Sequence, residues 1–301
     1  MNGGLPSVTI GIPFFNAEST LLDAVRSVFA QTHQSWELLL VDDGSSDRSL
    51  EIARSIDDPR VTVYSDGRNK RLAARLNEIV GLAKFDFIAR MDADDLMCRD
   101  RIERQLRVLV ERAEVDLVSA GVVSVSGASM VTGIRCVPPG HAVEPDAVLA
   151  GHSGIVHAAA LARREWFLRN RYDESLKVSQ DTDLWIRACA NGDLRAEILP
   201  IPLYFYREDG NVTYAKLREA YRVHRRSIRA ASRGYRFSRR LSAYAASLVK
   251  SSGAYLAHRV DRMDLIRGRR NAMVLPSGQQ AEFERQIREI CATPLPLRSG
   301  I

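Results

Sequence analysis

Short apolar segments alternate with helical segments through the first third of this chain, and this alternation constrains the fold more than any other feature. The apolar segments are runs of strand length, rich in β-branched and aliphatic residues: Val8–Ile12, Trp36–Val41, Val61–Tyr64 and Phe87–Met91. Segments with helical spacing of their apolar residues follow them: Leu21–Phe29, Asp47–Ile56, 70–83 and Arg101–Arg112. Buried strands that alternate with helices predict an α/β fold with a doubly wound, mostly parallel, Rossmann-like sheet.

Polar loops follow three of these strands directly: Pro13–Glu18, Asp42–Ser46 and Asp92–Asp95. In doubly wound sheets, ligands bind outside the carboxyl ends of the strands. We therefore expect the three loops to meet at one crevice, although they lie far apart in the sequence.

Asp92, Asp94 and Asp95 crowd three carboxylates into four positions. Like charges this close repel and raise one another's pKa, and a bound divalent cation relieves the repulsion. Mg²⁺ and Mn²⁺ prefer hard oxygen ligands, and water and phosphate commonly complete their coordination. The pattern predicts a divalent cation site, and the alternative is an acidic turn that caps the helix beginning near Asp100.

The chain is less regular up to about residue 213 and helical after it. Val115–Val125 and Gly154–Leu161 are expected strands, Leu199–Arg207 is extended, and Asp181–Asn191 is an expected helix. Four more helices are expected, with breaks at Gly234, Gly253 and Pro276: 215–232, 237–250, 253–268 and 278–291. The pattern predicts an α/β body with a C-terminal helical appendage.

Charge is divided unevenly along the chain. The net charge is +6, yet residues 216–270 hold 14 arginines and two lysines against three acidic residues, so the remainder is acidic. Such a segment can pack on the acidic body or a second subunit, or it can lie on an anionic membrane surface. Packing against protein, which includes a homo-oligomer, and binding to a membrane surface both stay open. Nucleic acid is not expected as a partner, because no aromatic-interleaved motif accompanies the arginines.

The four cysteines are scattered without metal-ligand spacing, and the first residues lack the basic and apolar regions of a signal peptide. No apolar run approaches the ~18–20 residues that span a bilayer. These features predict a reduced, cytoplasmic protein, with peripheral attachment to the inner face of the membrane as an option through the basic segment.

Five motifs in order resemble those of the family 2 glycosyltransferases: Val8–Glu18, Ser27–Thr32, Val41–Asp47, Met91–Asp95 and Gln180–Arg187. The resemblance, which covers roughly residues 6–210, implies the GT-A fold, a nucleotide-diphosphate sugar as donor, and inversion of the anomeric centre. It also implies three parts of the chain. Residues 1–114 would form the nucleotide-sugar-binding half and 115–213 the acceptor-binding half of one domain, followed by the basic helical region 214–301.

The resemblance implies a donor pocket lined by four residues of the first loop: Pro13, Phe14, Asn16 and Glu18. Asp43 would accept a hydrogen bond from an N–H group of the base. Arg71 stands where the family often has a glycine, and it would either reach the base or phosphates or remain a solvated cation. Asp42 is expected to hydrogen-bond the loop backbone instead.

The resemblance also places Asp92 and Ala93 against the donor, with Asp94 and Asp92 as ligands of Mn²⁺ or Mg²⁺ and Asp95 behind them. Transfer with inversion is an in-line displacement that needs a general base for the acceptor hydroxyl. Asp181 is implied as that base, although Gln180 replaces the glutamate that the family commonly has before it. The structural alternative for Asp181 is a helix N-terminal charge, which is the expected role of Asp183. His157 is expected to be a packed or hydrogen-bonded histidine.

The function predicted from these residues is a metal-dependent inverting glycosyltransferase in surface polysaccharide synthesis. It would move a sugar from a nucleotide-diphosphate donor, by default a UDP-sugar, to a saccharide or lipid-linked saccharide. One alternative is a sugar-nucleotidyltransferase, which would need a glycine-rich loop with a basic residue where Pro13–Asn16 stands. A second alternative is a non-catalytic sugar- or lipid-binding scaffold, against which the intact carboxylates argue.

Overall fold

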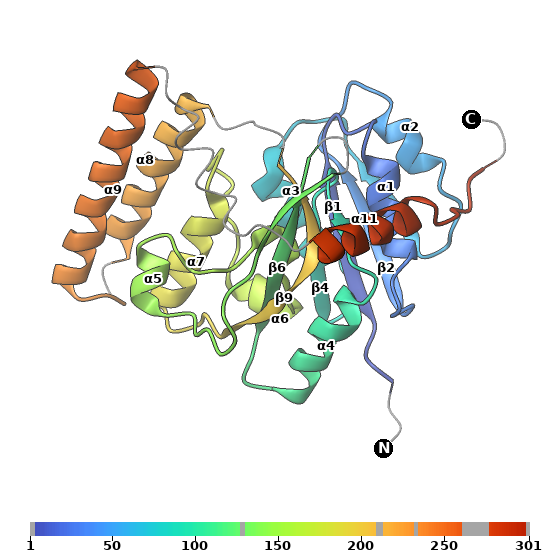
Figure 1. Cartoon of the computed structure of the whole chain (residues 1–301), viewed down its shortest axis with the longest axis horizontal. Coiled ribbons are helices and arrows are strands. Elements are labelled where there is room, and N and C mark those ends of the chain that lie inside the picture. Colours follow the sequence, from blue (N-terminus) through green and yellow to red (C-terminus); the bar gives the residue numbers. More distant parts are fainter. Residues whose placement is uncertain (1–3, 127–129, 209–212, 232–233, 261–276, 299–301) are drawn as a thin grey trace.

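The computed structural model describes residues 4–126, 130–208, 213–231, 234–260 and 277–298, and its centre is a mixed sheet between two layers of helices (Figure 1). The nine strands follow the order β3-β2-β1-β4-β8-β6-β9-β5, with β7 paired to β6. Their bounds are β1 Val8–Phe14, β2 Trp36–Asp42, β3 Val61–Ser65, β4 Phe87–Arg90, β5 Leu96–Met97, β6 Leu117–Val125, β7 Val131–Arg135, β8 Leu161–Arg163 and β9 Ala196–Arg207.

The helices α1, α2 and α4 cover one face of the sheet, and α3, α6 and α7 cover the other. Their bounds are α1 Leu21–Phe29, α2 Ser49–Arg54, α3 Arg71–Leu82, α4 Arg101–Glu111, α5 Pro145–Leu149, α6 Arg164–Arg169, α7 Gln180–Ala190, α8 Tyr214–Ala230, α9 Phe237–Arg259 and α11 Ser277–Cys291. Successive side chains of a strand point to opposite faces, so Leu38 and Leu40 enter the first core while Leu39 and Val41 enter the second. The doubly wound α/β fold is confirmed.

Strands β1, β2, β3 and β4 are parallel to one another. In their register Phe14 lies beside Asp42 and Gly11 beside Arg90, so the carboxyl ends of β1, β2 and β4 open onto the same edge of the sheet. Gly11 allows α3 to pack closely on this sheet, because a Cβ there would lie 2.5 Å from Cγ2 of Ile79.

The strand expected at Gly154–Leu161 is wrong in its bounds. His157–Ala159 forms a 3-10 turn, and only the short β8 follows, antiparallel to both β4 and β6. Side chains of other elements donate hydrogen bonds to backbone carbonyls that would otherwise pair with a neighbouring strand. The Ser119 hydroxyl donates to Val156 O at 3.1 Å, and Gln105 Nε2 donates to Ala159 O at 2.8 Å.

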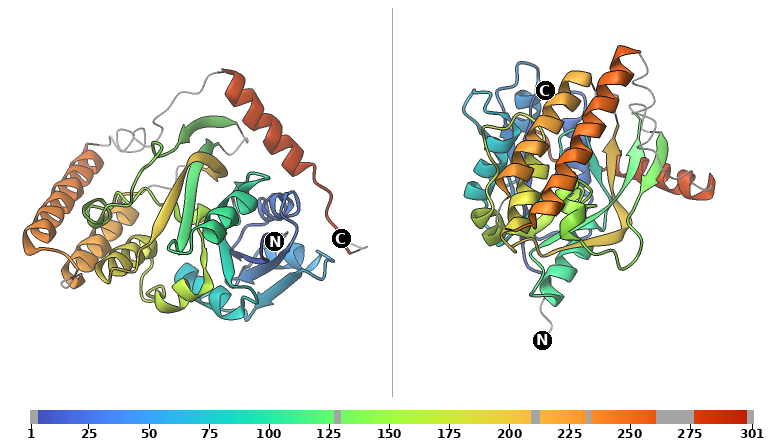
Figure 2. Two further views of the ribbon diagram at one scale, coloured as in Figure 1. Left: turned by 90° about the horizontal axis from the view of Figure 1, so that it is seen from below. Right: turned by 90° about the vertical axis from the view of Figure 1, so that its left-hand side faces the viewer.

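The C-terminal helices lie on two sides of the body (Figure 2). Helices α8 and α9 form a hairpin next to α7, whereas α11 packs against α1. α9 continues through Gly253, where a break was expected; a glycine inside a helix costs only ~1 kcal/mol relative to alanine. The rest of the expected helix 253–268 lies outside the described residues. No helix in the described ranges has the length and apolar character needed to cross a bilayer.

Candidate functional site

The loops after β1 and β2 are joined by reciprocal hydrogen bonds. Asn16 Oδ1 accepts from the Ser46 backbone N–H at 2.8 Å, and the Asn16 N–H donates to the Ser45 hydroxyl at 3.1 Å. The Glu18 carboxylate accepts from the Arg48 N–H at 3.0 Å. The expected meeting of these two loops is confirmed. The polar side chains of Asn16 and Glu18 hold the loops together, and their role toward a nucleoside stays a prediction.

The residues at the end of β1 differ in exposure. Pro13 and Phe14 are buried, and Phe14 packs in the core with 2% of its surface exposed. The side chain of Phe14 therefore faces the interior. Phe15, which follows, is 49% exposed in the loop after β1 and was not singled out from the sequence. Any aromatic contact to a ligand here would come from Phe15.

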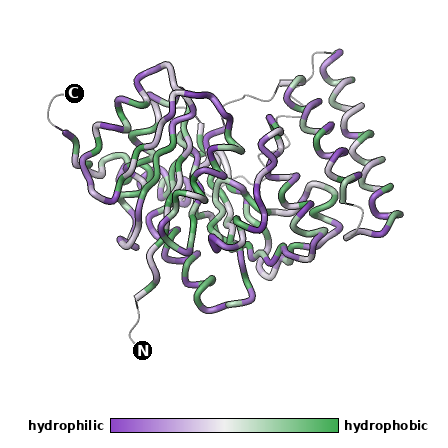
Figure 3. Tube along the Cα trace, turned by 180° about the vertical axis from the view of Figure 1, so that it is seen from behind, coloured by the Kyte–Doolittle hydropathy of each residue, from purple (hydrophilic) through white to green (hydrophobic). Residues whose placement is uncertain are grey.

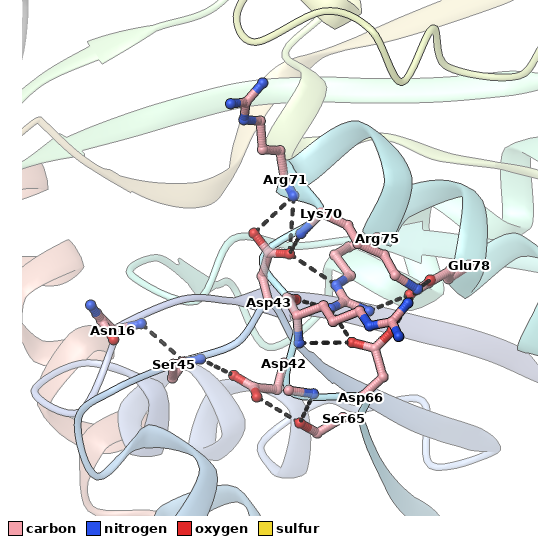
Figure 4. Close-up of polar contacts among 12 residues, drawn as sticks. Asn16, Asp42, Asp43, Ser45, Ser65, Asp66, Lys70, Arg71, Arg75 and Glu78 are labelled. Atoms are coloured by element: carbon pink, nitrogen blue, oxygen red, sulfur yellow. Dashed lines mark hydrogen bonds and ion pairs between the residues drawn. The ribbon is translucent and has the colours of Figure 1, made fainter.

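Asp43 is the centre of a charged network at the start of α3 (Figure 4). Its Oδ1 accepts from the Lys70 N–H at 2.7 Å and from Arg75 Nε at 3.0 Å. The Arg71 N–H donates to both carboxylate oxygens, at 3.0 and 3.1 Å. Oδ2 has this single contact among the described residues, so it keeps acceptor capacity for a base N–H.

Asp42 is 1% exposed and holds the loop, as expected. Its Oδ1 accepts from the Ser45 N–H at 2.9 Å, and its Oδ2 accepts from the Ser65 hydroxyl at 2.7 Å. Asp42 therefore orients the loop that carries Asp43.

Three non-glycine residues in the described part of the chain have positive φ: Asn16 at 49°, Arg71 at 72° and Ser179 at 55°. Each lies in or beside one of the segments predicted to form the site. Arg71 adopts the conformation that glycine favours, at the position where the resembling family often has glycine. Its exposed guanidinium points away from the Asp43 network (Figure 4). Such strain collects at ligand-binding positions, where surrounding contacts maintain it.

Asp92, Asp94 and Asp95 lie in the turn between β4 and β5, with carboxylate oxygens within 4.8 Å of one another. β5 separates them from α4, so the alternative of a turn that caps that helix is wrong. Asp94 is exposed, Asp92 is half-buried, and Asp95 is buried where its Oδ1 accepts from the Arg207 N–H at 2.7 Å. Ala93 is buried between them.

The pKa values of two of these carboxyl groups are raised. Burial raises the pKa of Asp94, and the charge of Asp92 adds to the effect. Burial raises the pKa of Asp95 further, with Asp92 and Asp94 adding. Hard oxygen atoms that repel one another at an accessible turn have the chemistry of a Mg²⁺ or Mn²⁺ site.

Two buried residues that the sequence analysis did not identify contact Asp92. Arg90, the last residue of β4, is buried and forms an ion pair with Asp92. The hydroxyl of the fully buried Tyr204 accepts from the Asp92 N–H at 3.0 Å. In the sequence, Arg90 is marked only as a charged residue at the end of an apolar strand. Tyr204 could have been noticed because it lies in the aromatic segment Leu199–Arg207.

Asp181 lies in the first turn of α7 and is partly buried. Its Oδ1 accepts from the Thr182 N–H at 2.8 Å. Burial raises the pKa of Asp181, while that hydrogen bond and the charge of Arg90 oppose the rise. Burial also raises the pKa of Tyr172, and Arg90, Asp181 and Asp92 all act on it. Tyr172 lines a small cavity together with Arg90, the ion-pair partner of Asp92.

His157 is a hydrogen-bonded histidine, as expected. Its Nε2 lies 2.8 Å from the Tyr172 hydroxyl, and its ring packs edge-on to Trp185 of α7. Burial lowers the pKa of His157, and the charge of Arg90 adds to that effect. A neutral His157 therefore fixes the position of the Tyr172 hydroxyl. Asp183 has a structural role, with its carboxylate bound to Arg187 at 2.7 Å and to the Ser227 hydroxyl at 2.6 Å.

A family model described as glycosyl transferase family 2 matches residues 9–169. EpsE of Bacillus subtilis, named as a glycosyltransferase, is 32% identical over 217 residues, which are 70% of this chain and 76% of EpsE. WfgD of Escherichia coli is named UDP-Glc:alpha-D-GlcNAc-diphosphoundecaprenol beta-1,3-glucosyltransferase. It is 33% identical over 104 residues, or 35% of this chain and 41% of WfgD.

Solved structures share the fold. TarS of S. aureus, residues 1–349 in complex with UDP-GlcNAc, is 16% identical and superposes with a TM-score of 0.62 over 96% of this chain and 82% of that one. The mannosyltransferase PcManGT of Pyrobaculum calidifontis, in complex with GDP-Man and Mn²⁺, is 18% identical with a TM-score of 0.60 over 95% and 86%. At these identities the likeness speaks for the fold alone, and the GT-A fold is confirmed.

Proposed function

This chain belongs to glycosyl transferase family 2, and we propose that it transfers a sugar with inversion, in a metal-dependent reaction, from a nucleotide-diphosphate donor to a saccharide or lipid-linked saccharide. One observation carries the proposal: the carboxylates of Asp92, Asp94 and Asp95 lie within 4.8 Å of one another in the turn after β4. The loop Pro13–Asn16 lacks the glycine-rich, basic sequence that a nucleotidyltransferase would need, and a non-catalytic scaffold has no need of the intact carboxylates.

The proposed donor is a UDP-sugar. TarS structures hold UDP and UDP-GlcNAc, and WfgD is named for UDP-Glc. Asp43 Oδ2 would accept from the base N–H, and the exposed Arg71 would reach the pyrophosphate or base from its strained position. Pro13, Asn16 and Glu18 would frame the nucleoside, with Phe14 contributing its backbone and Asp92 and Ala93 contacting the rest of the donor.

Asp94 and Asp92 are the proposed ligands of Mn²⁺ or Mg²⁺, with Asp95 buried behind them. A bound divalent cation would supply Lewis-acid neutralisation of the leaving diphosphate. Arg90 holds Asp92 by an ion pair, and the Arg207 N–H holds Asp95, so the protein fixes the direction of these oxygens.

Asp181 is the proposed general base. It would accept the proton of the acceptor hydroxyl as the oxygen attacks the anomeric carbon and the nucleotide leaves from the opposite side. The rise in its pKa caused by burial makes the carboxylate a better proton acceptor, and the Thr182 N–H bond and the charge of Arg90 limit that rise. His157 and Tyr172 would hold the acceptor side of this pocket in shape.

The proposed acceptor belongs to surface polysaccharide synthesis. Relatives are named for succinoglycan and teichuronic acid synthesis, and the substrate of WfgD is named as a diphosphoundecaprenol. A lipid-linked acceptor would require the enzyme to work at the inner face of a membrane, in the cytoplasm.

Donor hydrolysis by the full chain tests this proposal. We expect slow hydrolysis of UDP-Glc or UDP-GlcNAc that requires Mn²⁺ or Mg²⁺ and stops with EDTA, and we expect UDP to raise the melting temperature only when Mn²⁺ is present. GDP-Man is the comparison donor. Stabilisation by a nucleoside triphosphate alone would favour the nucleotidyltransferase and defeat the proposal.

Two variants separate the roles in the same assay. Asp181→Asn is expected to keep UDP binding and lose about 10²–10⁴-fold in turnover, as for loss of a general base. Asp94→Ala is expected to weaken both. Asp86→Asn is the matched control, because Asp86 is exposed just before the amino end of β4. Equal loss of UDP affinity in the Asp181 and Asp94 variants would remove Asp181 from the role of base.

A further inference from the structure

Helix α9, Phe237–Arg259, buries small side chains and exposes large apolar ones, which is the reverse of an ordinary surface helix. Its buried positions hold Ala243, Ser247 and Ala254. Its large apolar side chains are exposed, by 75% at Phe237, by 72% at Val249 and by 46–63% at four others: Leu241, Leu248, Tyr255 and Leu256. A surface helix normally turns its apolar stripe toward the core. Tyr244 packs against the core and the Tyr255 ring contacts Tyr214 of α8, whereas the five aliphatic and phenylalanine side chains named above are turned toward solvent.

The exposed residues form one continuous stripe. At 3.6 residues per turn, positions 237, 241, 248, 255 and 256 project from one side of α9, opposite the buried 243, 247 and 254. α9 also lies at one end of the molecule, where it packs on α8 and α5 (Figures 1 and 2). Hydrophobic segments recur along this outermost helix in Figure 3. The stripe is thus an apolar face that no described residue covers and that points away from the rest of the described protein.

Charge decides what fits this face. α9 carries four basic residues and no acidic residue, and α8 carries six basic residues and one glutamate, so the hairpin has a strong net positive charge. On the inner side of α9, Arg239 pairs with Asp146 of α5 and Arg240 donates to two backbone carbonyls of α8. Lys250 contacts His152 on that side, and Arg259 is exposed at the end of the helix. Two hairpins brought together in a symmetric dimer would repel each other through their net positive charge. A bilayer with anionic headgroups offers negative charge and hydrocarbon at the same surface.

We propose that the outer face of α9 binds the surface of an anionic lipid bilayer. The helix would lie in the plane of the membrane, with Phe237, Leu241, Leu248, Val249 and Leu256 below the headgroups. The exposed Arg259 would lie near the lipid phosphates, and the net positive charge of the hairpin would attract the anionic surface.

The hairpin is fixed to the acceptor side of the crevice. The Ser227 hydroxyl of α8 donates to Asp183 Oδ1 of α7 at 2.6 Å, and Arg226 pairs with Asp173 at 3.4 Å. α7 begins one residue before Asp181. A bilayer bound by α9 would therefore be held in a fixed relation to the proposed base, which suits a lipid-linked acceptor. This link rests on the proposed function, whereas membrane binding itself does not.

Vesicle co-sedimentation of the full chain tests the proposal. The probes are phosphatidylcholine vesicles with and without an equal share of phosphatidylglycerol. We expect binding that needs phosphatidylglycerol and weakens as salt is raised. Leu241→Glu/Leu248→Glu is expected to lower binding about tenfold or more. Leu82→Glu/Val110→Glu, with the same charge change at exposed sites of α3 and α4, is expected to bind like the wild type.

Thermal unfolding and circular dichroism check that both double variants are folded. The proposal is overturned if the wild type ignores phosphatidylglycerol vesicles, or if the α9 variant binds as well as its control. It is also overturned if the wild type is a dimer that the α9 substitutions dissociate, because a second copy then covers the face. UDP stabilisation with Mn²⁺ needs no lipid, so failure of membrane binding and failure of the catalytic proposal are distinguishable.

Discussion

Arg90 is a buried cation that pairs with one carboxylate of the site and shifts the pKa of two other groups. Its guanidinium is 5% exposed, pairs with Asp92, and opposes the rise in pKa that burial causes at Asp181 and Tyr172. Burial works to lower the pKa of Arg90 itself, yet the charge of Asp92 and its neighbours leaves that pKa above the ordinary value. Arg90 therefore stays charged, and its charge limits the rise in the pKa of Asp181.

Replacement of Arg90 should change how activity depends on pH. In Arg90→Met the positive charge that opposes burial at Asp181 is gone, so the pKa of this carboxyl rises further. The proposed base acts only when ionised. The acid limb of kcat/KM for donor hydrolysis should therefore move to higher pH by about one unit. The pH profiles of variant and wild type measure the shift.

Two further variants control for this prediction. Arg90→Lys keeps the positive charge, so its acid limb of kcat/KM should lie at the wild-type pH. If the role of Arg90 were merely structural, the charge alone would not restore the limb. Arg104→Met removes an exposed cation of α4 and should leave the profile unchanged. An acid limb that stays in place in Arg90→Met would show that Arg90 does not act on the base.

At the scale of elements, the start of α3 depends on one buried arginine. Arg75 has no exposed side-chain surface and pairs with Asp43 at 3.0 Å and with Asp66 and Glu78 at 2.7 Å each. Three carboxylates converge on this guanidinium, and Lys70 pairs with two of them. The network holds the loop 65–71 against the loop after β2, and it sets the orientation of Asp43 and the strained backbone of Arg71.

Arg75→Met should leave these carboxylates without their common cation. We expect a loss of about 3 kcal/mol in the free energy of unfolding, at the low end for a buried pair, because Asp66 and Glu78 remain a quarter exposed. Urea denaturation followed by tryptophan fluorescence measures the loss. Arg54→Met, at an exposed position of α2, is the control. Equal stability of the two variants would mean that the network does not hold the loop.

The elements that could be predicted from the sequence are those fixed by local periodicity. The parallel strands β1–β4 and the helices α1, α3, α4 and α7 follow from runs and spacings within a dozen residues. The antiparallel β8 and the turn at His157 could not be predicted, because they depend on Ser119 and Gln105 from distant elements. The carboxylates of the site were visible as a pattern, whereas Arg90 was not, since its burial depends on Tyr204, Arg101 and other side chains brought by the fold.

For the whole molecule, the end of the chain completes the N-terminal part of the fold. α11 packs against α1, and its Ile287 and Ile290 enter the core formed with β5, β6 and β9. Beyond the helix, the Asp57 N–H donates to Pro296 O at 2.7 Å and the Arg298 N–H to Ser55 O at 2.8 Å. The basic hairpin and α11 thus differ in role, since α8 and α9 lie at the periphery while α11 covers the strand β5 that follows the three carboxylates.

Ile290→Ala should therefore destabilise the whole protein, although residue 290 lies far from the crevice in the sequence. Ile290 has no exposed surface, and truncation of such a side chain costs about 2–5 kcal/mol through lost burial and the cavity left behind. Because this core includes β5 and β9, whose Arg207 N–H holds Asp95, we expect UDP with Mn²⁺ to recover part of the lost stability. Urea denaturation with and without UDP and Mn²⁺ measures both effects. Leu297→Ala, at a position that is 48% exposed, is the matched control. If the two variants unfold at the same urea concentration, α11 is an independent appendage and the C-terminus does not support the site.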